Sequence, residues 1–279
     1  MHLFSRSLVP LLVLSCAAQL SSCDADEAKA AAVANREIRD LITALTPAPP
    51  TSVPVEKSEH FATRKRTLER LRAASQAHGI EALRVYREEA PELPEVRAGL
   101  LDIAAHTAPK ACEELLVELV TTFGEDMLVR RAATELLGAC MPERAVQVLE
   151  PILRERYDGR TYPPEDRMLD SWILAKEKLR EDPVPLVALV ATDLQRAQDV
   201  RHLATRALGR HDSPLSRQAL ETLLVESSGN GYIRRIALQS LLAILPRPTF
   251  CELAKRIQSN EADTEFIVVL QSALDANCR

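Results

Sequence analysis

This sequence of 279 residues contains few aromatic side chains and few glycines. Phe, Trp and Tyr together make up 4% of it, with one tryptophan and 8 glycines in all. Leu, Ala, Glu and Arg, which favour helices, dominate the chain instead. The composition therefore predicts an all-α protein.

The sequence also lacks the common signatures of catalysis and of metal binding. It has no glycine-rich phosphate loop, no Gly-x-Ser-x-Gly turn and no protein-kinase signature. Neither a His-Glu-x-x-His nor a Cys-x-x-Cys spacing occurs. We accordingly predict a protein that is not an enzyme, with no catalytic residue, no metal site, no cofactor and no small-molecule substrate.

Positive charge is not in excess, and no apolar run is long enough to span a membrane. The formal net charge is −5, which argues against a nucleic-acid interface. The longest apolar run extends from Leu8 to Leu14 and continues more weakly to Leu20, whereas a spanning helix needs ~20 apolar residues. That length suits the core of a signal peptide.

The apolar run ends in Leu20-Ser21-Ser22-Cys23, and acidic residues follow at once. This pattern resembles the lipobox of bacterial lipoproteins. The resemblance implies a diacylglycerol on the thiol of Cys23, with residues 1–22 removed as a signal peptide. Without those residues Arg6 is lost and the net charge becomes −6. The protein would then lie in the bacterial cell envelope, anchored by lipid and facing the periplasm or the cell exterior.

Two alternatives to lipidation of Cys23 stay open. Cys16 also ends a short motif, but the large Leu14 stands where a small residue is preferred, and the chain after Cys16 stays apolar. Ordinary secretion without a lipid is the other alternative. In some Gram-negative bacteria an Asp after the lipidated cysteine marks retention in the inner membrane, and Asp24 fits that pattern.

Residues 23–60 are predicted to form a tether between the lipid and the body of the protein. Residues 24–46 read as a helix, whose apolar positions Ile38, Leu41, Ile42 and Leu45 share one face. Residues 47–60 contain four prolines, so an extended spacer is expected there.

Similar segments recur along the rest of the chain, with 33 residues between several of their starts. VRAGLLDIAAH begins at Val96, VRRAATELLGAC at Val129, VRHLATRALGRH at Val200, IRRIALQSLLAI at Ile233, and a weaker copy at Phe266. Each segment is followed by a second amphipathic stretch, so each unit is predicted to be a helix, a turn and a second helix. One such unit cannot bury its apolar faces, but a stack of units can.

Between positions 129 and 200 there is room for two units and a short insertion. MLDSWILAKEKL, from Met168, is the best candidate for the missing unit, and residues 157–166 for the inserted loop. Small residues and leucines recur in register, where they would allow close helix approach and fill the core: Ala133, Ala204 and Ala237, then Leu137, Leu208, Leu241 and Leu274.

These units resemble HEAT repeats, in particular the subclass of phycobilisome-lyase-like proteins. The resemblance rests on the Val-Arg starts, on the Ala and Leu columns and on ALGRHDSPLSRQALETLL at 207–224. It implies that residues 61–279 form an α-solenoid of antiparallel helix pairs that presents a surface to a protein or peptide partner. The alternative that the resemblance suggests is a lyase-like enzyme. DNA binding, known in some HEAT-like glycosylases, is disfavoured by the leader and by the acidic charge.

Four cysteines remain after the leader and the lipid site, and the repeat register pairs them. Cys112 and Cys251 fall near the start of a second helix, whereas Cys140 and Cys278 fall at the end of a first helix. The register predicts disulfides Cys112–Cys140 and Cys251–Cys278, each joining adjacent repeats. Buried free thiols are the alternative.

An arginine follows the start of four repeats, at Arg97, Arg130, Arg201 and Arg234. It could form a basic stripe for an anionic partner, but its repetition favours contacts to carboxylates or helix-end carbonyls of the neighbouring unit.

Other polar and aromatic candidates have ordinary structural explanations. Trp172, Tyr157 and Tyr162 could form an interaction site, with core packing the alternative for Trp172. His106 is expected at a helix end, and His211-Asp212-Ser213 at a turn between helices, where Asp and Ser are common caps.

Overall fold

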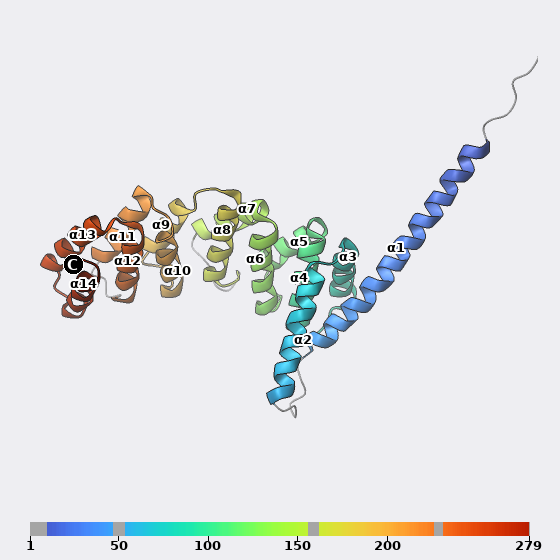
Figure 1. The fold of residues 1–279 in the computed structure, drawn as a ribbon, viewed down its shortest axis with the longest axis horizontal. Coiled ribbons are helices and arrows are strands. Elements are labelled where there is room, and N and C mark those ends of the chain that lie inside the picture. Colours follow the sequence, from blue (N-terminus) through green and yellow to red (C-terminus); the bar gives the residue numbers. More distant parts are fainter. Residues whose placement is uncertain (1–9, 47–53, 156–161, 226–230, 279) are drawn as a thin grey trace, which may run out of the picture. The chain divides into compact units, whose positions relative to one another are not determined.

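The computed structural model of the chain describes residues 10–46, 54–155, 162–225 and 231–278, with side chains described from residue 26 to 46 and from residue 62 onward within these ranges. The described residues are helical and include no strand, so the protein is all-α as its composition predicts (Figure 1). Tyr157 lies outside the described residues, as do the side chains of Cys16 and Cys23.

Fourteen α-helices and one π-helical segment make up the described chain. They are α1 (Pro10–Leu45), α2 (Pro54–Arg72), α3 (Gln76–Arg84), η1 (Val85–Glu89), α4 (Pro94–Thr107), α5 (Pro109–Thr121), α6 (Met127–Cys140), α7 (Pro142–Arg154), α8 (Glu165–Leu179), α9 (Val184–Thr192), α10 (Gln198–Leu208), α11 (Pro214–Val225), α12 (Gly231–Ile244), α13 (Arg247–Asn260) and α14 (Thr264–Asn277).

The helices occur where the repeat predicts them. The segments expected to be first helices fall in α4, α6, α8, α10, α12 and α14, and Met168 lies within α8. The helices between them, α5, α7, α9, α11 and α13, are the expected second helices. The prediction of a helix, a turn and a second helix per unit is confirmed for these elements.

Proline marks the start of the second helices. Pro109, Pro142 and Pro214 are the first residues of α5, α7 and α11. Proline suits the first helical position because the amide hydrogen that it lacks would have no partner there, and its fixed φ is already helical. Short turns such as the single residue Ala108, between α4 and α5, follow from these strong start signals.

The small-residue and leucine columns are buried as expected. Ala133, Ala204, Ala237, Leu137, Leu208 and Leu241 are all 0% exposed, and Leu274 is 8% exposed.

Two glycines in one register position permit close helix contact. A Cβ on Gly138 would lie 2.5 Å from the carbonyl oxygen of Ser171, and one on Gly209 would lie 2.7 Å from the Ser240 side chain. Neither contact leaves room for a larger residue.

The chain divides into two compact units, Met1–Leu136 and Leu137–Arg279, with the division inside α6. In the second unit the first helices α8, α10 and α12 pack in sequence, and the second helices α9 and α11 pack on each other. Contacts between consecutive helices, such as α7 with α8 and α9 with α10, join the two rows. In this unit, first helices therefore pack on first helices and second helices on second helices of the neighbouring pair.

In the first unit α1 belongs to the packed body from Ala34 onward, which corrects that part of the predicted tether of residues 23–60. Ala34, Ile38, Leu41 and Leu45 are buried, and α1 packs on α3, α4 and α2. The apolar face seen in the sequence is therefore part of the core, because burying it stabilises the fold more than leaving it on a solvated stalk would. The body accordingly begins well before residue 61.

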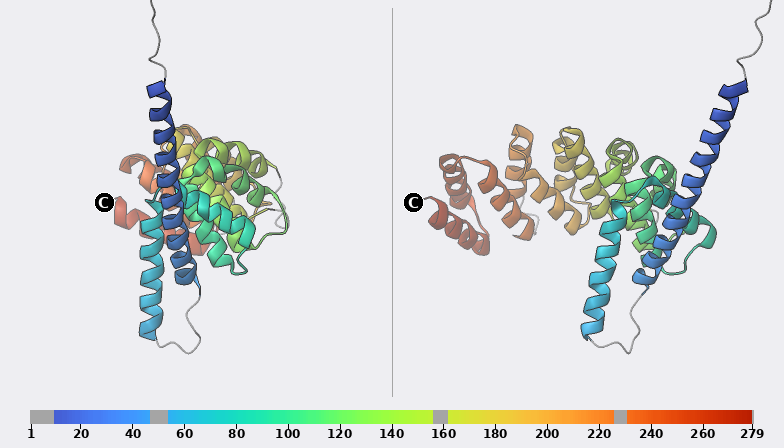
Figure 2. Two further views of the ribbon diagram at one scale, coloured as in Figure 1. Left: turned by 90° about the vertical axis from the view of Figure 1, so that its right-hand side faces the viewer. Right: turned by 45° about the vertical axis from the view of Figure 1, so that its right-hand side comes forward.

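The extended spacer predicted for residues 47–60 is also wrong in its second half. Helix α2 begins at Pro54, where proline is compatible with a first helical position, and residues 47–53 lie outside the described residues. Helices α1 and α2 lie side by side with opposite chain directions (Figure 2).

Within the described part of the chain, no helix combines the length and the hydrophobicity of a membrane span.

Candidate functional site

Three of the four repeated arginines are buried and bind carbonyl groups at helix ends, so they do not form a basic surface. Arg130, Arg201 and Arg234 are 1%, 9% and 5% exposed. Their Nε atoms donate to carbonyl oxygens in the last turn of the preceding second helix, to Leu119 at 3.1 Å, Ala191 at 3.0 Å and Leu224 at 2.9 Å, respectively. These carbonyls have no partner within their own helix, and a cation there also interacts favourably with the helix dipole.

Two members of the arginine column, Arg97 and Arg234, pair with carboxylates. Arg97 pairs with Glu125 at 2.6 Å. Arg234 additionally contacts Glu261, lies 3.6 Å from Asp263, and sits with its guanidinium carbon 3.8 Å from the ring centre of Phe266. The structural interpretation of the column is thus confirmed, and the interpretation as a stripe for an anionic partner is wrong.

In the repeat that lacks the column arginine, an arginine from another part of the chain binds the helix-end carbonyl. The repeat that contains Met168 has Leu169 in the arginine position. There Arg196, in the turn before α10, donates to the carbonyl oxygen of Leu153 at 2.6 Å, near the end of α7, and forms an ion pair with Glu165. The guanidinium at the end of α7 therefore comes from a residue 43 positions away in sequence.

Arg196 and Glu165 form a buried pair, with side chains 8% and 4% exposed. Burial raises the pKa of the Glu165 carboxyl above its ordinary value, although the charge of Arg196 and its hydrogen bond act in the opposite direction. The pair stabilises the fold only while both partners are present, because either charge alone would be buried without compensation.

One of the two predicted disulfides is present. Cys251 on α13 is bonded to Cys278, the residue after α14, with 5.8 Å between their Cα atoms. The bond ties the last helix to the preceding helix pair, as the repeat register predicts. Cys112 is buried on α5 and Cys140 is the last residue of α6, in different compact units, so their pairing stays a prediction.

The proposed aromatic interaction site is wrong for Trp172. This side chain is 1% exposed, and its indole Nε1 donates to Glu150 at 3.3 Å. It therefore fills the core between α7 and α8. Tyr162 is partly exposed near the start of α8, and Tyr157 lies outside the described residues.

His106, Asp212 and Ser213 have structural roles. The Nδ1 atom of His106 lies 2.8 Å from the carbonyl oxygen of Asp102, within the last turns of α4. Ser213 Oγ accepts a hydrogen bond from the backbone N–H of Ser216 at 3.1 Å, which caps the start of α11, and Asp212 accepts from Arg217. Among the described residues, no group of three or more His, Cys, Asp or Glu side chains could hold a metal ion.

An apolar groove of about 430 Å³ lies between the second helices α9 and α11. It is lined by Pro185, Ala188, Leu189, Thr192, Leu215, Gln218, Ala219 and Thr222. Leu189 and Leu215 are 47% and 42% exposed, which is high for large aliphatic side chains. The groove has neutral polar groups at its rim and no ionisable lining residue.

A second groove, of about 400 Å³, lies between the first helices α8 and α10 and is strongly polar. It has carboxylates at Asp166, Asp170 and Asp199 and guanidiniums at Arg206 and Arg210. His202 also lines it, and burial together with the charge of Arg206 lowers the pKa of this imidazole. The imidazole is therefore neutral over a wider pH range than an exposed histidine.

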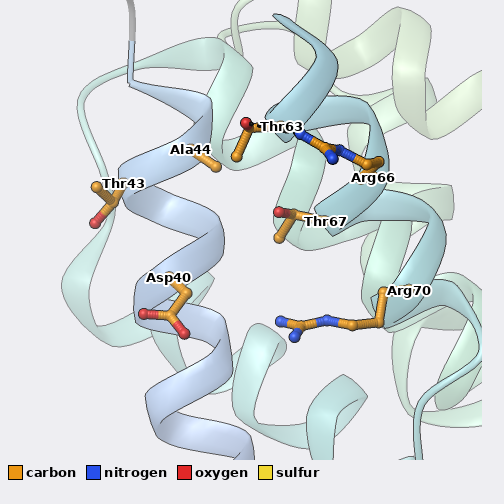
Figure 3. A pocket seen from close by; sticks show the side chains of 7 residues that line it. All are labelled: Asp40, Thr43, Ala44, Thr63, Arg66, Thr67 and Arg70. Carbon is orange, nitrogen blue, oxygen red and sulfur yellow. Dashed lines mark hydrogen bonds between the residues drawn. The ribbon is translucent and has the colours of Figure 1, made fainter. Parts of the chain in front are cut away.

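A third groove, of about 470 Å³, lies in the first unit between α1 and α2 (Figure 3). Asp40, Thr43 and Ala44 line it from α1, and Thr63, Arg66, Thr67 and Arg70 line it from α2. Figure 3 shows Asp40 and Arg70 pointing toward each other from opposite walls. The groove was not expected from the sequence, because its α1 wall was assigned to the tether of residues 23–60, whereas the lining residues of α2 were assigned to the body.

Comparisons with known protein families, with curated proteins and with solved structures find no match to this chain. The resemblances to HEAT repeats and to a lipobox therefore stay interpretations of the sequence.

Proposed function

We propose that this protein is a lipid-anchored scaffold of the bacterial cell envelope, which binds a protein or peptide through the second helices of an α-solenoid of HEAT-like repeats. It would face the periplasm or the cell exterior, held to the membrane through Cys23. The proposal assigns it no catalytic step.

The observation that carries the proposal is the order of helix neighbours in the second unit. First helices α8, α10 and α12 contact one another in sequence, and second helices α9 and α11 contact each other. This order is expected of a solenoid, in which each repeat packs on its neighbours and the second helices line one face. The buried arginines support the same interpretation, because each joins one helix pair to the next.

The groove between α9 and α11 supports a partner site on that face. Binding sites are concave and mainly apolar, and Leu189 and Leu215 lie exposed in this groove. A partner that covers them would gain roughly 25 cal/mol for each Å² of apolar surface removed from water. The neutral rim fits an apolar segment with uncharged polar neighbours.

Two features support a location outside the cytoplasm with a lipid anchor. The apolar leader that ends at Cys23 resembles a lipobox, and the Cys251–Cys278 disulfide is typical of oxidising compartments outside the cytoplasm. Two acyl chains on one cysteine would suffice for stable anchoring, since each buried methylene contributes ~0.8 kcal/mol.

Photo-crosslinking in cells of the native host tests the partner site. A benzophenone amino acid placed at Leu189 and, separately, at Leu215 should give the same discrete adduct from both positions. The matched control is Ile80, which is 54% exposed but belongs to the first unit. Adducts that also form from position 80, or that differ between positions 189 and 215, would contradict a specific partner in this groove.

A further inference from the structure

The groove between α1 and α2 has the chemistry of a site for a phospholipid headgroup. Its two walls carry opposite charges, with Asp40 on α1 and with Arg66 and Arg70 on α2. Figure 3 marks no hydrogen bond among the described side chains of Asp40, Thr67 and Arg70. Arg66 donates to the Ala62 carbonyl oxygen at 3.3 Å and to Thr63 Oγ1 at 3.5 Å. A carboxylate, a guanidinium and a hydroxyl thus face one open space of about 470 Å³ without pairing with each other.

The α2 wall suits a phosphate. A guanidinium presents several donors in a fixed plane that matches phosphate oxygens, and a threonine hydroxyl can add a further hydrogen bond. Arg66 and Arg70 are one helical turn apart, as are Thr63 and Thr67, so each pair lies on one face of the helix. The described side chains of α2 are also rich in cations, with Glu69 the one acid beside Arg64, Lys65, Arg66, Arg70 and Arg72.

The α1 wall selects among phosphates. A simple oxyanion near Arg70 would also meet the negative charge of Asp40, which would weaken its binding. A phosphate diester that carries a primary ammonium two carbons away can instead satisfy both walls, because its ammonium can donate to Asp40. The headgroup of phosphatidylethanolamine has this arrangement.

We propose that the α1–α2 groove binds the phosphoethanolamine headgroup of a membrane lipid, with Arg70, Arg66 and Thr67 toward the phosphate and Asp40 toward the ammonium. The lipid source rests on the membrane attachment proposed above, since the predicted lipid site at Cys23 and the groove residue Asp40 belong to the same helix, α1. The groove would then hold the α1–α2 hairpin at the membrane surface by a second contact, in addition to the lipid anchor.

NMR titration of the full chain in detergent micelles with soluble headgroup probes tests the chemistry, and it does not depend on lipidation of Cys23. Glycerophosphoethanolamine should bind more tightly than glycerol phosphate, inorganic phosphate or glycerophosphocholine, whose quaternary ammonium has no N–H to donate. Arg70→Gln should weaken binding by about tenfold or more, which is the loss of one charge-assisted contact. Asp40→Asn should remove the preference for the ammonium-bearing probe while retaining phosphate binding.

Lys65→Gln is the matched control, because Lys65 lies on the same helix, is 68% exposed and does not line the groove. Equal weakening by Lys65→Gln, or equal binding of inorganic phosphate and glycerophosphoethanolamine, would overturn the proposal. Flotation of the full chain then tests the membrane source. Vesicles containing phosphatidylethanolamine should recruit more protein than phosphatidylcholine vesicles, and Asp40→Asn should abolish that difference. Unlipidated Cys23 would refute the anchor without altering the titration.

Discussion

The N-terminal hairpin and the C-terminal repeats hold their helices together by different means. In the hairpin region Arg39 on α1 bridges to Glu89 in η1 at 2.5 Å, with side chains 47% and 32% exposed, and Asn35 on α1 donates to Glu81 on α3 at 2.6 Å. In the repeats Arg201 and Arg234 are buried and donate to helix-end carbonyls. Exposed pairs gain little and are screened by salt, whereas a buried guanidinium is costly to remove because its partners stay desolvated.

The largest expected effect comes from removing a buried arginine. Arg234→Met removes the guanidinium that binds Glu261 and the Leu224 carbonyl, and it removes the contact over Phe266. We expect the free energy of unfolding of the second unit to fall by about 3–5 kcal/mol, the cost of breaking a buried charged contact. Denaturant unfolding measures it.

Arg235, the next residue, is exposed and provides a matched control. Arg235→Met should change stability by less than about 0.5 kcal/mol, as surface substitutions usually do. Similar losses in the two variants would contradict a difference in stabilisation between buried and exposed arginines.

The disulfide should have the next largest effect. Replacing both Cys251 and Cys278 by Ser opens a loop with a sequence separation of 27 residues, which corresponds to about 3–4 kcal/mol on the chain-entropy model. The amides of α14 should then exchange hydrogen faster, because this last helix is held by the bond and by packing on one side. Unchanged protection of α14 would show that packing alone holds the helix.

Acidification should reduce the stability that some carboxyls of the first region contribute, and increase the stability that Glu165 of the second region contributes. A hydrogen bond from Arg84 lowers the pKa of Glu81, and one from Arg39 lowers the pKa of Glu89. The unfolded chain then binds protons more readily than the folded chain. The stability from these pairs is present above the ordinary carboxyl pKa of 4.5 and is lost as pH falls through the lower folded value.

Glu165 should behave in the opposite way, because burial raises its pKa. Its contribution favours the folded state below the ordinary pKa and is lost as pH rises through the raised folded value. Unfolding free energies measured between pH 7 and pH 3 should therefore fall less steeply on acidification in Glu81→Gln than in the parent, and more steeply in Glu165→Gln. Equal slopes in the two variants would contradict these assignments.

The smallest effect is expected at the exposed ion pair. Arg39→Gln should cost about 0.5 kcal/mol, and added salt should remove most of that difference. The cost of Arg234→Met should persist in salt, because the side chains of Arg234 and Glu261 are only 7% and 12% exposed. Unfolding of both variants at low and at high salt gives the comparison, and a salt-sensitive Arg234 would contradict it.

The helix pairs could be predicted because their signals are local and repeated. Apolar residues at helical spacing, a recurring Val-Arg start and buried columns such as Ala204 and Leu208 all act within one repeat or between neighbours. The disulfide Cys251–Cys278 followed from the same register. The grouping into two compact units, by contrast, has no mark in the sequence, because the division falls inside the continuous helix α6.

The features that the sequence did not predict depend on contacts between distant residues. The guanidinium of Arg196 reaches Leu153 across 43 positions, which no motif around Met168 indicates. Tryptophan is common at interaction sites, and the sequence around Trp172 does not show that its side chain is buried against Glu150 on another helix. The burial of Ile38 and Leu41 was visible as an apolar face, yet its partner α3 was not, so the segment was assigned to a tether.

Mass spectrometry of the N-terminal peptide from protein purified out of its native membrane tests the central proposal most directly. A lipid-anchored scaffold predicts a chain that begins at Cys23, with a diacylglycerol on its thiol and residues 1–22 absent. A mature chain that carries an unmodified Cys23, or that retains the leader, would contradict it.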